Sequence, residues 1–324
     1  VALGAGVALA PAPPWRVVPR VGVGLATGRV TGGISLAFAG DGIRFTALAD
    51  RTIRDFGDRP VISSTLNSLT AEESGNDFGD YVLVDRAAIR ATIPLGARTA
   101  LDLELARERA DSLPVAAHPA SGIFRPNPQF AMDATSVARL DLRRPAARGD
   151  DRASAGGAVS LEGGAGGSSY LRLSARVEAG WPIGATAMRF RASGGVGTDE
   201  LPTWRGFALG GRGTLVGEPY RAWGGREAAL ASVEWRFPVT IPAIPLGSFA
   251  STGHQMTLGP YFAAGWAGGP EPGMPWIPSP GVRPVAGIAA EWLMGLLRVE
   301  SGWSLRTGSF GVTVDVSPEW WGVL

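Results

Sequence analysis

The chain has 324 residues, and its 30 basic residues, all of them arginine, stand against 29 acidic residues for a net charge of +1. This balance excludes a general electrostatic attraction to nucleic acid or acidic lipid. Cysteine is absent, which excludes disulfides, thiol nucleophiles and thiolate metal sites.

The N-terminal residues form the longest apolar run of the chain. This run, residues 1–10, is much shorter than the roughly 18 to 20 residues of a membrane-spanning helix. It lacks the initiator methionine and the basic start that a signal peptide would have. We therefore expect residues 1–14 to be a linker, or the truncated end of a native chain that continues upstream.

The remainder of the chain alternates between apolar and polar residues with a period of two. In Leu171–Trp181, for example, every odd-numbered residue is apolar and no even-numbered residue is. Side chains of a strand alternate between its faces, so each such segment has one apolar and one polar face. Fourteen segments follow this pattern, at residues 15–26, 29–39, 42–50, 80–93, 97–109, 134–143, 156–163, 169–181, 184–194, 228–238, 256–267, 283–294, 296–306 and 309–317.

The length of these segments favours strands that cross a bilayer. Most have about 9 to 13 residues, which a tilted transmembrane strand needs, whereas ordinary strands have about 5 or 6. No long helical pattern interrupts them, so residues 15–324 are expected to form one domain. Fourteen strands are visible in the sequence.

The connections between the segments also alternate in length. If residues 195–227 lie outside the cell, the outer side includes the other long connections and most connections on the inner side are short turns, as in outer-membrane barrels. The long connections are 51–79, 110–133, 195–227 and 268–282, and the short ones are 40–41, 94–96, 182–183 and 295. Two inner connections, 144–155 and 239–255, are longer than this pattern predicts.

Alternation alone does not separate a membrane barrel from a soluble sandwich, because both have one apolar face. Aromatic residues near the strand ends favour the barrel, since girdles of such residues mark both membrane interfaces. On the numbering above, Trp181, Trp235, Trp292, Trp320 and Trp321 lie near the inner rim, and Trp266 and Trp303 near the outer rim. The sequence therefore predicts an all-β protein, a transmembrane antiparallel β-barrel.

A glycine-rich stretch, Phe207–Tyr220, precedes the last five segments. With a glycine-rich loop followed by five strands, the chain resembles the C-terminal barrel of the BamA-type family, also called the bacterial surface antigen family. The resemblance implies sixteen strands in the complete barrel, eleven before the loop and five after it. Nine segments precede the loop here, so two strands are missing from this chain, a hairpin lies within 51–79 or 110–133, or the barrel has fourteen strands.

The resemblance also implies that the glycine-rich loop folds back into the barrel, where an arginine of the loop pairs with an aspartate of the second strand after it. The loop motif maps onto Gly210, Gly211, Leu215, Val216, Gly217 and Tyr220, and the partner strand onto Phe262, Ala263 and Gly265. Val216 stands where the family has the arginine, and Ala263 stands where it has the aspartate. The loop motif is therefore degenerate in this chain.

Losing both charges is physically coherent, because a single survivor would be an unpaired buried charge. We expect the loop to be anchored instead by Arg212 or Arg221, paired with Glu234, Glu300 or Asp315. The alternative is that residues 195–227 form an ordinary external loop.

The sequence offers no constellation for catalysis. Its two histidines, His118 and His254, fall in loops and have no metal-ligand spacing around them, and no nucleophile elbow is present. We therefore expect no enzyme activity, no cofactor, no metal and no nucleic-acid partner.

The family resemblance implies a barrel in the bacterial outer membrane that aids the insertion or secretion of other proteins. Its expected partners are outer-membrane lipids, including lipopolysaccharide, and client outer-membrane or secreted proteins, with a periplasmic domain upstream in the full-length protein. Two alternatives stay open: a membrane anchor or translocator of a larger protein, and a passive pore or structural barrel.

Overall fold

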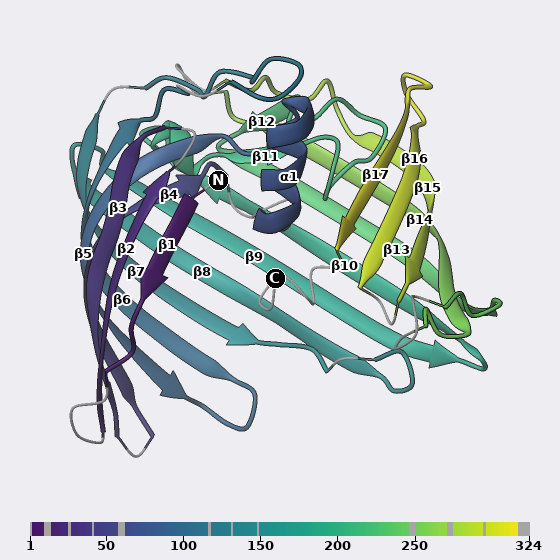
Figure 1. Ribbon diagram of the computed structural model, residues 1–324, viewed down its shortest axis with the longest axis horizontal. Coiled ribbons are helices and arrows are strands. Elements are labelled where there is room, and N and C mark those ends of the chain that lie inside the picture. Colours follow the sequence, from purple (N-terminus) through teal and green to yellow (C-terminus); the bar gives the residue numbers. More distant parts are fainter. Residues whose placement is uncertain are drawn as a thin grey trace.

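The computed structural model describes residues 2–9, 14–24, 27–40, 42–57, 62–115, 118–130, 132–147, 149–245, 251–270, 275–293 and 296–316. Most of them belong to one large antiparallel sheet that curves around a central space, here called the lumen (Figure 1). The fifteen strands of the sheet are β1 (Ala2–Gly6), β2 (Trp15–Gly24), β3 (Arg29–Ala39), β4 (Arg44–Asp55), β5 (Tyr81–Pro94), β6 (Ala100–Ser112), β7 (Asp133–Arg144), β8 (Ser154–Gly166), β9 (Tyr170–Ile183), β10 (Thr186–Gly197), β13 (Glu227–Thr240), β14 (Gln255–Gly268), β15 (Arg283–Trp292), β16 (Leu297–Ser304) and β17 (Phe310–Val316).

Neighbouring strands of the sheet follow chain order, with β10 next to β13. The two strands between them, β11 (Phe207–Leu209) and β12 (Trp223–Gly225), pair only with each other. The edges of the sheet are β1 and β17, and no strand pairing within the described residues joins them. Over the described residues the barrel is therefore open, with β1 and β17 at the opening.

All fourteen strands predicted from the sequence are present, as β2–β10 and β13–β17. Strand β1 is an addition, because Ala2–Gly6 pairs antiparallel with β2 where we expected part of a linker. Its sequence, Ala-Leu-Gly-Ala-Gly, has no polar residue, so it gives no alternating signal. The hidden hairpin is not found in the described residues of 51–79 or 110–133.

The first of these two connections contains a helix instead, α1 (Ser64–Ser74), which lies within the curve of the sheet (Figure 1). The side chain of Ser63 caps the helix by accepting from the backbone N–H of Leu66 at 3.3 Å, and Gly75 ends it in the left-handed conformation. Few of its residues are apolar, so it has no apolar stripe that would reveal a helix in the sequence. No helix among the described residues is long and apolar enough to cross a membrane.

Burial on the two faces of the sheet is inverted relative to a soluble protein. On β6 the side chain of Leu105 is 58% exposed on the outer face, whereas Glu104 and Glu108, on the lumen face, are only 4% and 3% exposed. Arg86 pairs with both of these glutamates across the lumen face. Apolar residues outside and paired charges inside are what a transmembrane barrel requires.

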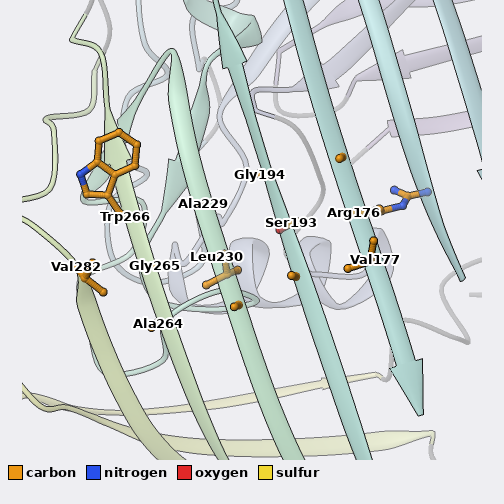
Figure 2. Close-up of a pocket in the computed structure, with 13 residues that line it drawn as sticks. Arg176, Val177, Ser193, Gly194, Ala229, Leu230, Ala264, Gly265, Trp266 and Val282 are labelled. Atoms are coloured by element: carbon orange, nitrogen blue, oxygen red, sulfur yellow. The ribbon is translucent and has the colours of Figure 1, made fainter. Parts of the chain in front are cut away.

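The outer face also has an apolar depression of about 380 Å³ across β9, β10, β13 and β14. Its floor consists of small residues, and Trp266 and Val282 border it on one side (Figure 2). The floor residues that share the outer face are Ala175, Ala192, Gly194, Ala229, Ala231 and Ala264. The depression continues the apolar outer wall and contains few polar atoms.

Candidate functional site

The loop between β10 and β13, residues 198–226, folds into the lumen and is called the lumen loop below. It contains a 3-10 turn at Thr203–Arg205 and the β11–β12 ribbon. The side chains of Phe207, Leu209 and Leu215 are buried against small residues on the inner face of β13, β14 and β15. An ordinary external loop would leave these three side chains in water, so apolar burial accounts for the inward fold.

Val216 and Ala263 are the positions at which the BamA-type family would have its arginine and aspartate. Both are buried apolar residues here, at 3% and 1% exposure, and Ala263 packs in the cluster around Phe207. Next to Val216, the backbone of Gly217 touches the backbone of Gly302 on β16. Close backbone and apolar contacts therefore occupy the place of the family's ion pair.

An ion pair of opposite polarity lies beside them. Glu218 of the lumen loop accepts hydrogen bonds from Arg283 of β15, with Nη2–Oε2 at 2.8 Å and Nε–Oε1 at 3.2 Å. Ser304 donates to the same carboxylate at 2.5 Å, and the Trp223 indole donates at 3.2 Å. The loop thus supplies the carboxylate and the barrel wall supplies the guanidinium.

The register of β14 and β15 shows that Arg283 lies close to Ala263, the position that corresponds to the aspartate of BamA-type barrels. Ala263 lies opposite Val285, and Arg283 is two residues before Val285 on the same lumen face. Burial alone would raise the pKa of Glu218, but the hydrogen bonds from Arg283, Ser304 and Trp223 outweigh burial and lower it. The carboxylate is therefore held in its charged form. Sequence reasoning did not single out this pair, whose members are 65 positions apart.

Arg221 anchors the other side of the lumen loop. Its guanidinium binds Asp55 at the end of β4, with Nη2–Oδ2 at 2.6 Å, and Asp80 just before β5, with Nη1–Oδ2 at 2.6 Å. It also donates to the Phe56 carbonyl at 3.1 Å. Arg221 is almost fully buried, and burial lowers its pKa, but the neighbouring Asp55 more than compensates and the pKa is raised.

These partners differ from the expected ones. Glu234 and Glu300 lie on the lumen face of β13 and β16, where both pair with Arg298 of the wall, at 2.9 Å and 2.6 Å. Their charges are already compensated, and neither is paired with Arg221. The pairing of Arg221 with either glutamate was therefore a wrong expectation.

Arg212 contacts the last strand. It donates through Nη1 to Asp315 at 3.2 Å and to the Val314 carbonyl at 2.8 Å, which places it against β17. Its guanidinium also lies 4.8 Å from the ring centre of Phe78, in the connection that carries α1. Arg212 thus joins the lumen loop to an edge strand of the sheet.

A fourth charged residue of the lumen loop, Arg205, was not singled out in the sequence. It pairs with Glu108 of β6 and, at 2.6 Å, with Glu162 of β8. The phenol of Tyr170 donates to Glu162 at 2.7 Å. The four charged anchors Arg205, Arg212, Glu218 and Arg221 therefore hold the loop to four different parts of the wall.

The remaining residues of the loop motif are at the bends of the loop. Gly210 and Gly211 have φ angles of 120° and 68°, which only glycine adopts readily. Tyr220 donates its hydroxyl to the Phe78 carbonyl, and burial raises the pKa of its phenol. Gly265 lies in the wall beneath Leu215 and Leu209. Phe262, by contrast, is on the outer face and is 44% exposed.

The expected girdle tryptophans lie on the outer face as far as they are described. Trp181, Trp235, Trp266 and Trp303 are between 36% and 46% exposed. Trp292 lies opposite Leu297, and the alternation of β15 places it on the same outer face. Trp320 and Trp321 lie outside the described residues.

Replacing Gly217 with alanine is expected to loosen the lumen loop. Its φ angle is 106°, and an added Cβ would come within 2.8 Å of the Gly302 carbonyl oxygen and 3.0 Å of the Ser304 nitrogen. A matched control is Gly308, which has a φ angle of 70° and an open space around its Cβ position. Backbone strain of about 1–3 kcal/mol is common to both changes, so only G217A adds the clash. Faster proteolysis within residues 198–226 in G217A than in G308A would be observed, and equal rates would contradict this contact.

The fold was compared with known proteins. No family profile matches the chain, and no curated protein matches its sequence. Solved structures do match: BamA from Haemophilus ducreyi lacking POTRA domains 1–3 aligns with a TM-score of 0.56 and 13% identity, over 97% of this chain and 69% of that one. The chain has the barrel fold of BamA. CdiB from Acinetobacter baumannii aligns with a TM-score of 0.56 and 14% identity, and CdiB from Escherichia coli with 0.51 and 10%.

The two CdiB alignments also cover 97% of this chain, but only 56% and 58% of the CdiB chains. The chain therefore spans little more than half the length of CdiB and about two thirds of the BamA form. At 10% to 14% identity, these likenesses establish the fold, and they confirm the resemblance to a BamA-type barrel at that level.

Proposed function

We propose that the chain acts in the bacterial outer membrane as a barrel that aids the insertion or translocation of other proteins. The observation that carries this proposal is the attachment of the lumen loop to β17, the last strand, at the opening of the sheet. The partners would be client outer-membrane or secreted proteins. The fold shared with BamA and CdiB supports the proposal, together with the apolar outer wall of this chain.

The edge strand β17 supplies the chemistry for contact with a client. An edge strand has backbone N–H and C=O groups without a neighbour, and an extended segment of another chain can pair with them. One side of β17 is bonded to β16, and the other faces the opening opposite β1. A client strand that pairs there would enter the sheet directly from the lumen or the membrane.

The lumen loop holds this edge in place. Arg212 binds Asp315 and Val314 on β17, and Ser309, just before β17, donates to the Gly217 carbonyl at 2.5 Å. Movement of the loop would therefore change the freedom of the last strand. In this proposal the loop controls how readily β17 moves away from the lumen loop and accepts a client strand.

The test is a client-insertion assay in vesicles. Purified barrel is reconstituted, and the rate at which an unfolded outer-membrane protein becomes protease-protected is compared with empty vesicles. A several-fold acceleration is expected, altered in R212A and unchanged in R98A, whose arginine lies in a turn far from the loop. A barrel that is inserted but gives no acceleration or translocation would contradict the proposal. A conductance without client handling would identify a passive pore, and neither activity would leave a membrane anchor.

A further inference from the structure

The outer wall carries a group of charged residues near the loop-side ends of β4, β5 and β6. On β6 the exposed residues change along one face from Leu103 and Leu105 to Arg107, Arg109 and Asp111, while the residues between them are buried on the lumen face. The charges therefore lie on the membrane-facing side. Arg51 of β4 and Asp85 of β5 share this face, and the five residues together are called the rim patch.

The strand register brings the rim patch together. Arg51 lies opposite Asp85, and Asp85 lies opposite Arg109, so the three form a row across three strands. Arg51 binds Asp85, with Nη2–Oδ2 at 2.7 Å, so the one carboxylate of that row is already paired with Arg51. Arg107 donates to the Ser136 hydroxyl at 3.0 Å. Within the described part of the chain, neither Arg107 nor Arg109 forms an ion pair with a carboxylate.

The level of the rim patch on the wall suits a headgroup rather than a lipid tail. Below it on β6 the exposed residues are leucines, and above it the strand ends at Ser112. On β14 and β16 the residues near the corresponding ends are Trp266 and Trp303, both exposed on the outer face. Tryptophan and arginine both favour the boundary between hydrocarbon and headgroups. The patch therefore lies where the apolar wall gives way to polar surroundings.

We propose that Arg107 and Arg109, with Arg51 beside them, bind the phosphate of a lipid headgroup in the outer leaflet. A guanidinium forms two parallel hydrogen bonds to a phosphate, and the two β6 arginines are about 6.6 Å apart along one face, so both reach the same headgroup. The Ser136 hydroxyl adds a polar group at the same place. This inference rests on the proposed location in the outer membrane.

The test measures binding of fluorescent bisphosphorylated lipid A to the detergent-solubilised barrel, with dephosphorylated lipid A as the second probe. The R107A/R109A variant is expected to bind the phosphorylated lipid about 10- to 30-fold more weakly and the dephosphorylated lipid unchanged. The control R44A/R98A removes two exposed arginines, one at the start of β4 and one in the turn between β5 and β6, at the other end of these strands, and is expected to bind as the wild type does. Equal binding by wild type and R107A/R109A, or an equal loss in the control, would overturn the inference.

Competition with inorganic phosphate distinguishes a site for a lipid headgroup from a site for free phosphate. Little competition by excess phosphate is expected, because the lipid also contacts the apolar wall below Arg107; full competition at equal affinity would show a free-phosphate site and overturn the lipid proposal. The assay needs no client protein. Loss of client insertion with lipid binding intact would therefore count against the proposed function alone, and the reverse result against the rim patch alone.

Discussion

Replacement of Arg221 with alanine is expected to release the lumen loop from the side of the barrel formed by β4 and β5. The side chain is buried between Asp55 and Asp80, and its removal leaves the Asp55 carboxylate without a cation. Breaking a buried pair by removing one partner lowers stability by about 3–5 kcal/mol. The expected result is rapid proteolysis within residues 198–226 and a lower unfolding temperature in detergent. Asp80 keeps one partner, Arg125, at 2.8 Å.

Asp199 provides a matched control in the same loop. Its side chain is 84% exposed and pairs with Arg226, and surface pairs of this kind contribute about 0–1 kcal/mol. D199A is therefore expected to leave the cleavage rate and the unfolding temperature near those of the wild type. If R221A behaves like D199A, Arg221 does not anchor the loop.

Replacement of Glu218 with alanine is the second change with a large expected effect. It leaves the Arg283 guanidinium buried without its carboxylate, again a loss of about 3–5 kcal/mol. Adding Arg283→Met is expected to recover much of this loss, because the uncompensated charge is removed and an apolar side chain of similar length remains. The double-mutant cycle is measured by unfolding temperature and by protease cleavage of the loop. Equal destabilisation in E218A and E218A/R283M would show that the pair does not hold the loop.

The same pair predicts a dependence on acid. The folded protein lowers the pKa of Glu218, so the stability that this group contributes is fully present above the unfolded value of about 4.3. The contribution is lost as the pH falls through the lower, folded pKa. The wild type is therefore expected to lose more stability than E218Q between pH 5 and strongly acidic solution, measured as unfolding temperature against pH. Parallel curves for the two proteins would contradict this.

The fold could be predicted from the sequence because it rests on a local, repeated signal. Alternation marks each strand from its own residues, and all fourteen predicted strands are present. The alternation gives no signal where a segment has too few polar residues or too few apolar ones. Ala2–Gly6 has no polar residue, and α1 has no apolar stripe, so neither could be recognised by its period.

The anchors of the lumen loop were harder to predict, because ion pairs depend on the path of a loop rather than on a period. Asp315 was among the expected partners because the parity of β17 places it on the lumen face, and the structure brings Arg212 to it. Asp55 and Asp80 border a connection whose course no pattern in the sequence reveals. Arg283 shares the lumen face with Ala263, and a search of that face for charges would have found it.

The anchors of the lumen loop also set the order in which the molecule can assemble. They join residues far apart in the chain: 97 positions for Arg205 and Glu108, 103 for Arg212 and Asp315, and 166 for Arg221 and Asp55. Hairpins between neighbouring strands close much shorter segments and so form with a smaller loss of chain entropy. Docking of the loop therefore waits until β4 and β17 are both in place. We therefore expect strand pairing to precede docking of the loop, so that the last strand is first held by β16 alone.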